Sequence, residues 1–125
     1  MDEQFPPGWA DLKYPWIRKE LLENLADLTI DDPLQLWAVQ TRQGMCVGFD
    51  EVIHFFFDDH DFDEGDVGFS LFSNGEAQAI HNLKSALSQI CDDLPEGNNE
   101  QSVSHPIWPE VQKLAGIAAS LLRAS

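Results

Sequence analysis

The residue types best suited to chemistry in this chain are six carboxylates crowded into nine consecutive positions. They are Asp58, Asp59, Asp61, Asp63, Glu64 and Asp66, and His60 and Phe62 lie among them. Like charges this close repel one another unless a cation or a basic partner neutralises them. The run therefore points to two kinds of site, a metal centre or a docking surface for a basic protein.

Calcium is the cation that the spacing suggests first. Asp59, Asp61 and Asp63 occupy positions one, three and five of an EF-hand loop. The rest of the register fails, because position six is Glu64 rather than glycine and position twelve is Ser70 rather than glutamate. We therefore expect a solvated acidic loop or a protein-binding patch rather than a calcium site.

His54 and Asp58 form a second candidate. On a helix their side chains lie four positions apart on one face, where they can share a hydrogen bond or a metal ion. A metal site needs three or four convergent ligands, and the other histidines are scattered at positions 60, 81 and 105. The sequence therefore predicts a structural His54 at the edge of the core, and no metal or cofactor. A metal-dependent hydrolase that uses His54 with some of Asp58, Asp59, Asp61 and Asp63 is the alternative.

Other catalytic signatures are missing from the sequence. There is no G-x-S-x-G nucleophile motif, and neither Cys46 nor Cys91 has a histidine spaced to activate it. Gly44 and Gly48 are not followed by the Lys-Ser or Lys-Thr of a phosphate-binding loop. We therefore assign no catalytic residue and expect a binding protein rather than an enzyme.

The charge balance restricts the class of partner. The 125 residues include 22 Asp and Glu but only seven Lys and Arg, which gives a formal net charge of -15. Binding to nucleic acid or to an anionic membrane needs clustered Lys and Arg, so neither is an expected partner. A basic protein is the expected partner, because opposite charges steer association.

The N-terminal residues and the cysteines bear on the compartment. Residues 1–7 are acidic and contain proline, unlike the basic start and apolar stretch of a signal peptide. No apolar run reaches the roughly 18 residues that a membrane-spanning helix needs. Two buried thiols in a reducing cytoplasm are the favoured interpretation of Cys46 and Cys91, with a disulfide as the alternative. We expect a soluble cytoplasmic protein.

Apolar spacing and helix-start residues predict a mainly α fold, a compact bundle of about five helices with at most one or two short strands. The expected helices span 15–28, 33–42, 50–58, 74–93 and 107–123. Pro15, Asp32-Pro33 and Ser73 mark three starts, since proline suits the first turn and Asp or Ser caps the free amides. A buried strand is the alternative to a helix over 49–57. Residues 67–72 are expected to form a short strand or connector, and 95–105 a mobile loop.

A single domain is expected over 1–125, because no linker or repeat divides the chain. Residues 1–13 are predicted to form an extended arm that could pack Phe5 and Trp9 onto the rest of the protein. The helical body is expected to span 14–122.

The spacing of apolar residues along each expected helix predicts which side chains lie in the core. The aromatic residues expected in the core or at its edge are Trp16, Trp37, Phe56 and Trp108. Arg18 lies on the face of the first helix that is expected to point outward. Phe62 differs, because an aromatic residue among carboxylates is typical of an interface anchor within a charged rim, although it could tuck back under the loop. The predicted partner-binding residues are Asp58, Asp59, Asp61, Phe62, Asp63, Glu64 and Asp66.

Several landmarks, taken in order, resemble those of a family of short, largely uncharacterised bacterial proteins found in actinobacteria and proteobacteria. They are Tyr14-Pro15, Arg18, Leu25-Ala26-Asp27-Leu28, Gln35, Trp37, Asp50 to Val52, His54, Phe57-Asp58-Asp59, Val67-Gly68, Glu76 and His105-Pro106-Ile107-Trp108-Pro109-Glu110-Val111. The resemblance covers about 14–122 and brings no established activity or catalytic residue.

In size and acidity the chain is also similar to the small immunity proteins that neutralise secreted or contact-dependent bacterial toxins. That likeness implies a non-enzymatic, acidic protein-binding module that neutralises a basic toxin domain. The alternatives are the metal-dependent hydrolase and an uncharacterised regulatory protein.

Overall fold

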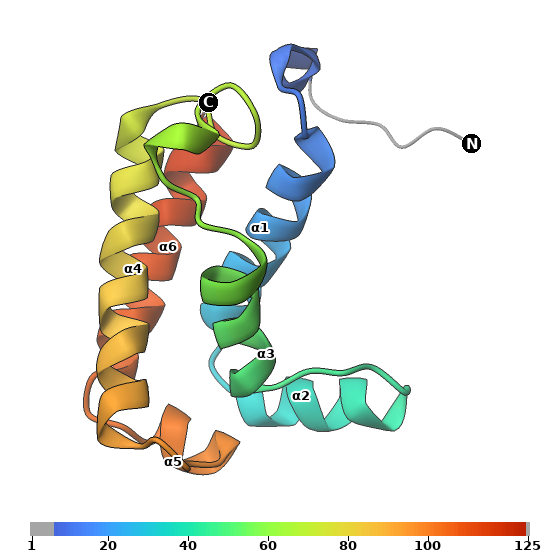
Figure 1. Cartoon of the computed structure of the whole chain (residues 1–125). Coiled ribbons are helices and arrows are strands. Elements are labelled where there is room, and N and C mark those ends of the chain that lie inside the picture. The colour runs from blue at the N-terminus through green and yellow to red at the C-terminus, as the bar shows by residue number, and fades with distance from the viewer. Residues whose placement is uncertain (1–6, 125) are drawn as a thin grey trace.

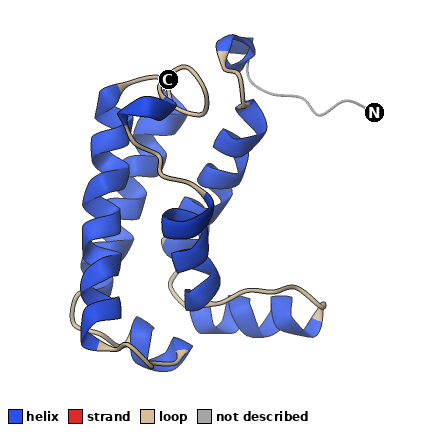
Figure 2. Ribbon diagram, in the orientation of Figure 1, coloured by secondary structure: helices blue, strands red, loops and turns tan. Residues whose placement is uncertain are grey.

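The computed structural model describes residues 7–124 and confirms the mainly α fold (Figures 1 and 2). The α-helices are α1 (Pro15–Leu28), α2 (Pro33–Arg42), α3 (Phe49–Ile53), α4 (Asn74–Asp93), α5 (Asn99–Val103) and α6 (Trp108–Ala124). Three short helices of other types are η1 (Pro7–Asp11, 3-10), η2 (His54–Asp59, π) and η3 (Glu64–Asp66, 3-10). The described part of the chain contains no β-strand, and an isolated bridge joins Val67 to Leu71.

Helix α6 lies between α1 and α4 and packs against both (Figure 1). Its packing surface is rich in small side chains, which let neighbouring helices approach closely. Alanines 115, 118 and 119 of α6 are buried. The larger core side chains come from the stripes of all three helices and include Leu21, Leu25, Leu28, Ile80, Leu83, Leu87, Ile90, Val111 and Leu122. The apolar faces of α1, α4 and α6 therefore form one core.

Local start signals account for the helices whose bounds were predicted correctly. Pro15 begins α1, and the Asp32 carboxylate caps α2 by accepting from the Gln35 amide at 3.1 Å. The Ser73 hydroxyl caps α4 by accepting from the Glu76 amide at 3.3 Å. The bounds of α1, α2 and α4 agree with the predicted ranges.

The ambiguous third segment is helical, and its start differs from the prediction. The helix begins at Phe49 rather than at residue 50, and Gly48 is its N-cap residue, with a φ of 132° that residues other than glycine rarely adopt. A Cβ at Gly48 would also lie 2.9 Å from Nδ2 of Asn99. The Asn99 side chain accepts from the Phe49 amide at 2.8 Å, so α5 closes against the start of α3.

Three other predicted segments are corrected. Residues 95–105 contain α5, whose capping box pairs the Asn98 and Gln101 side chains with each other's amides. Residues 7–11 of the predicted extended arm form η1, and Trp9 is buried, whereas Phe5 lies outside the described residues. Residues 67–72 form tight turns rather than a strand.

Several side chains lie elsewhere than predicted. Arg18 is fully buried rather than outward, and Trp16 is 50% exposed rather than in the core. Trp37, Phe56 and Trp108 are buried, as predicted. Both cysteines are free, and the exposed thiol at position 46 makes the prediction of two buried thiols wrong.

Candidate functional site

The acidic segment, residues 58–66, leaves the end of η2 and runs past α4 through η3. It follows Phe55 and Phe56, which are adjacent in sequence and both buried. The exposed carboxylates in it are those of Asp58, Asp59, Asp61, Asp63 and Glu64, and Asp66 is half-buried. The predicted charged surface is therefore present on one continuous stretch of chain.

The buried side chain of Phe62 packs the acidic segment against the core. This side chain is only 2% exposed, and its ring centroid lies 5.5 Å from that of Phe55, 6.1 Å from Phe56 and 5.0 Å from His60. The residue has a φ of 52°, a left-handed conformation that turns the chain sharply. Of the two predicted placements of Phe62, the exposed interface anchor is wrong, because the neighbouring phenylalanines bury the ring, and the placement under the loop is confirmed.

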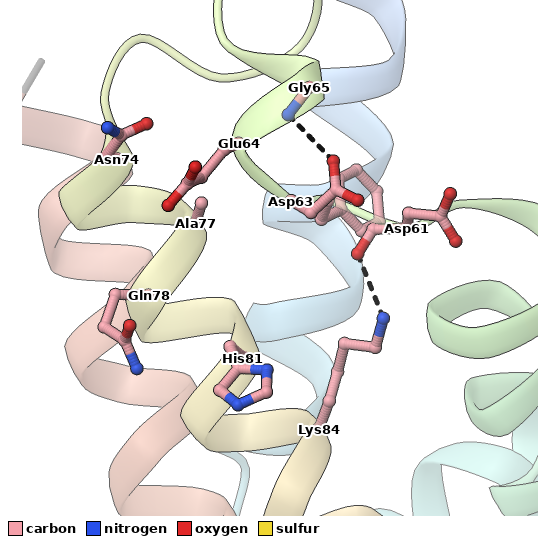
Figure 3. Close-up of a pocket in the computed structure, with 10 residues that line it drawn as sticks. Asp61, Asp63, Glu64, Gly65, Asn74, Ala77, Gln78, His81 and Lys84 are labelled. Atoms are coloured by element: carbon pink, nitrogen blue, oxygen red, sulfur yellow. Dashed lines mark hydrogen bonds between the residues drawn. The ribbon is translucent and has the colours of Figure 1, made fainter.

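Hydrogen bonds fix the segment on both sides of Phe62. The Asp63 carboxylate accepts from the Gly65 amide at 2.9 Å, and the Asp66 carboxylate accepts from the Asp63 amide at 3.0 Å. The Lys84 ammonium of α4 donates to the backbone carbonyl of Asp61 at 3.0 Å (Figure 3). These contacts hold the backbone in one conformation while leaving the Asp61 carboxylate pointing away from Lys84.

Two hollows border the acidic segment. The larger, of about 590 Å³, lies between the acidic segment and α4 and is lined by Gln78, His81 and Lys84 of α4 together with Asp63 and Glu64 (Figure 3). The smaller hollow, of about 300 Å³, is lined by residues of α1, its N-cap, the acidic segment and the following turn. Its lining consists of Tyr14, Ile17, Asp58, Asp59, His60, Asp61, Phe62, Asp66 and Ser70.

The carboxylates of the segment have almost no counter-charge within the protein. Over residues 7–124, none of them forms an ion pair with a Lys or Arg side chain. Asp58 is paired with Nδ1 of His54 at 2.5 Å, with both side chains more than half exposed. Lys84 donates to a carbonyl instead, and its ammonium lies 5.1 Å from the Phe57 ring centroid. The segment therefore presents a concentrated negative field to solvent.

The histidine–aspartate pair does not extend into a metal site. His54 and Asp58 meet on one helical face, as their spacing predicted. Among the described residues, no group of three or more His, Cys, Asp or Glu side chains is arranged to hold a metal ion. Asp59, Asp61 and Asp63, the residues in EF-hand register, thus do not form a ligand group with one another.

No known protein family matches this chain, and neither curated proteins nor solved structures provide a match. The family resemblance and the likeness to immunity proteins stay predictions. Within residues 7–124, no helix combines the length and apolar character needed to cross a membrane.

An exposed aromatic cluster beside the site was missed by sequence reasoning. The Tyr14 ring centroid lies 5.4 Å from that of Trp16 and 5.8 Å from that of Phe69. A signal for this was present, because Trp16 shares its face of α1 with Glu20 and Glu23 rather than with the leucine stripe.

Proposed function

We propose that the chain is a non-enzymatic, acidic protein-binding module whose acidic segment covers the basic surface of a protein partner. The observation that carries this proposal is a run of carboxylates on a fixed backbone, without a Lys or Arg ion pair in the described part of the chain. Such an arrangement costs repulsion in the free protein, and a basic partner relieves it.

The rigid attachment of the segment supports a role in binding. Burial of Phe62 and the hydrogen bonds of Asp63, Asp66 and Lys84 order the segment before a partner arrives. A preordered surface loses little conformational entropy on association, so more of the interaction free energy contributes to affinity. Uncompensated negative charge also accelerates encounter with a basic surface and rejects acidic ones.

The partner class that fits best is a bacterial toxin domain that acts on nucleic acid, with this chain as its cytoplasmic immunity protein. The active surface of such a toxin is rich in Lys and Arg, since it must neutralise phosphates. An acidic protein bound to that surface excludes the nucleic acid, because it pairs with the same Lys and Arg side chains. The alternative of a metal-dependent hydrolase gains no support from the described residues, which offer no ligand group.

The proposal is tested by capturing the partner from the source organism with tagged protein and identifying it by mass spectrometry. The variant Asp59→Asn, Asp61→Asn, Asp63→Asn should retain its fold, because asparagine at position 63 can still accept from the Gly65 amide. We expect this variant to recover much less of a basic protein than wild type does.

The matched control removes three exposed charges far from the segment, at the C-terminal end of α4, in the α4–α5 connection and in α5. It is the variant Asp92→Asn, Glu96→Gln, Glu100→Gln. We expect this control to recover as much partner as wild type does. That result would show that binding depends on the acidic segment rather than on the net charge of the protein. Equal recovery by both triple variants, or capture of an acidic protein, contradicts the proposal.

A further inference from the structure

The surface next to the acidic segment carries an aromatic patch, formed by Tyr14, Trp16 and Phe69. Trp16 is 50% exposed and Phe69 is 37% exposed, although both are large apolar side chains. Their positions are fixed, because the Tyr14 amide donates to the Phe69 carbonyl at 2.8 Å and the Tyr14 ring contacts both other rings. Rigid, exposed Trp and Tyr side chains are the residues that most often dominate binding energy at interfaces.

The faces of these rings accept a cation. The ammonium of Lys13 lies 5.7 Å from the Tyr14 ring centroid and 5.6 Å from that of Phe69. A cation at this distance is attracted by the negative face of an aromatic ring. Lys13 is itself exposed, so an incoming cation can displace its ammonium from the ring faces.

The patch is continuous with the acidic segment through Tyr14. The same tyrosine that stacks on Phe69 also lines the hollow of about 300 Å³, together with Asp58, Asp59 and Asp66. The Tyr14 side chain and these carboxylates therefore line one concave surface, next to the Trp16 and Phe69 rings that Tyr14 contacts. This combination suits a guanidinium group, which stacks its plane on an aromatic ring and donates from its edge to carboxylates.

From this juxtaposition we propose that the aromatic patch and the adjoining hollow receive an arginine side chain of the basic partner, which makes Trp16 and Tyr14 the anchor of the interface. The inference rests on the proposed function and replaces Phe62 as the expected anchor. A second copy of the chain is a poorer occupant, because two molecules of charge -15 repel each other.

The test uses two aromatic-free peptides of equal length, one of alternating glycine and arginine and one of alternating glycine and lysine. Binding is measured at physiological ionic strength by titration. Trp16 reports on the patch, because the other three tryptophans, Trp9, Trp37 and Trp108, are at most 5% exposed. We expect the arginine peptide to bind more tightly than the lysine peptide and to protect Trp16 from quenching by acrylamide.

The variant Trp16→Ala should weaken binding of the arginine peptide about fivefold and lessen the preference for arginine over lysine. The matched control is Ile117→Ala, an apolar residue of α6 that is 46% exposed and lies outside both hollows. We expect that variant to bind like wild type. The triple variant at Asp59, Asp61 and Asp63 should weaken both peptides, and the arginine peptide somewhat more, because Asp59 and Asp61 also line the hollow.

The outcomes separate the two proposals. If Trp16→Ala binds both peptides as wild type does while the triple variant binds them weakly, the proposal of an aromatic anchor is wrong. The proposal that the acidic segment binds a basic partner is then still supported. If neither variant changes binding, the proposed function fails as well. Self-association of wild type that Trp16→Ala abolishes also overturns the anchor, because a second copy would then occupy the patch.

Discussion

Arg18 of α1 and Glu76 of α4 form a buried, bidentate ion pair, with both nitrogen–oxygen distances at 2.8 Å. The guanidinium also donates to the carbonyl oxygens of Ser70 at 3.1 Å and Leu122 at 2.9 Å. It lies 4.5 Å from the ring centroid of Phe72. One side chain thus joins α1, the turn before α4, α4 itself and the end of α6, and so supports the elements around the acidic segment.

Breaking this pair from one side should strongly destabilise the protein. We expect Glu76→Leu to lower the free energy of unfolding by about 3–5 kcal/mol, because it leaves the Arg18 charge buried without its carboxylate. The double variant Arg18→Met, Glu76→Leu should lose less than Glu76→Leu alone, since it removes both charges. Urea unfolding gives the free energy of unfolding of wild type, of Glu76→Leu and of the double variant. A Glu76→Leu variant within about 1 kcal/mol of wild type would show that the pair is dispensable.

Phe62 should contribute to stability rather than directly to binding. We expect Phe62→Ala to lower the free energy of unfolding by about 3–5 kcal/mol, because it leaves a cavity beside Phe55 and Phe56. The comparison is Phe57→Ala, whose ring is 37% exposed and whose loss should cost much less. Equal stability losses in the two variants, measured by thermal or urea unfolding, would argue against Phe62 as the attachment point.

Asp27 offers a test of pH dependence. Burial, with a smaller contribution from the charge of Glu23, raises the pKa of the Asp27 carboxyl above its ordinary value of 3.8. A raised carboxyl pKa means that the native state disfavours the ionised form, so the destabilisation is present above the folded pKa and vanishes below the unfolded one.

Asp27→Asn should therefore increase the free energy of unfolding at pH 7 and have no such effect below about pH 3.8. Glu23→Gln should give a smaller increase of the same sign, because burial is the larger cause. Urea unfolding across this pH range measures both effects. An Asp27→Asn chain that is less stable than wild type at pH 7 contradicts the assignment.

The two thiols should differ in reactivity. Cys46 is exposed, whereas burial, aided by Asp92 and Asp50, raises the pKa of the Cys91 thiol above 9.0. Because the thiolate is the reactive form, iodoacetamide should alkylate Cys46 first at neutral pH. Peptide mass spectrometry after timed labelling follows each site, and labelling in denaturant is the control. Equal rates in the native protein would contradict the burial of Cys91.

Local signals in the sequence were sufficient for helices whose start residues and apolar stripes are close together in the chain. Pro15 and the Asp32-Pro33 pair placed α1 and α2 at their observed bounds. The five residues of α5 carry no apolar stripe, so the Asn98 and Gln101 capping pair went unrecognised although it was visible.

Long-range partners explain what the sequence could not show. Arg18 is in register with Leu21 and Leu25 on the buried face of α1, and the carboxylate that compensates its charge there comes from Glu76, 58 positions away. The burial of Phe62 depends on rings that η2 brings beneath the acidic segment. Periodicity reports which face of a helix is apolar, but it does not report which distant group will compensate a buried charge.

The central claim is that the acidic segment steers a basic partner, and the association rate as a function of salt tests it most directly. Stopped-flow mixing with the captured partner should show fast association of wild type at low salt, slowing as the Debye length falls from about 30 Å at 0.01 M to about 8 Å at physiological ionic strength. The triple variant at Asp59, Asp61 and Asp63 should associate more slowly at low salt and depend less on salt, whereas the triple variant at Asp92, Glu96 and Glu100 should follow wild type. If both triple variants associate as fast as wild type at every salt concentration, the acidic segment does not bind the partner.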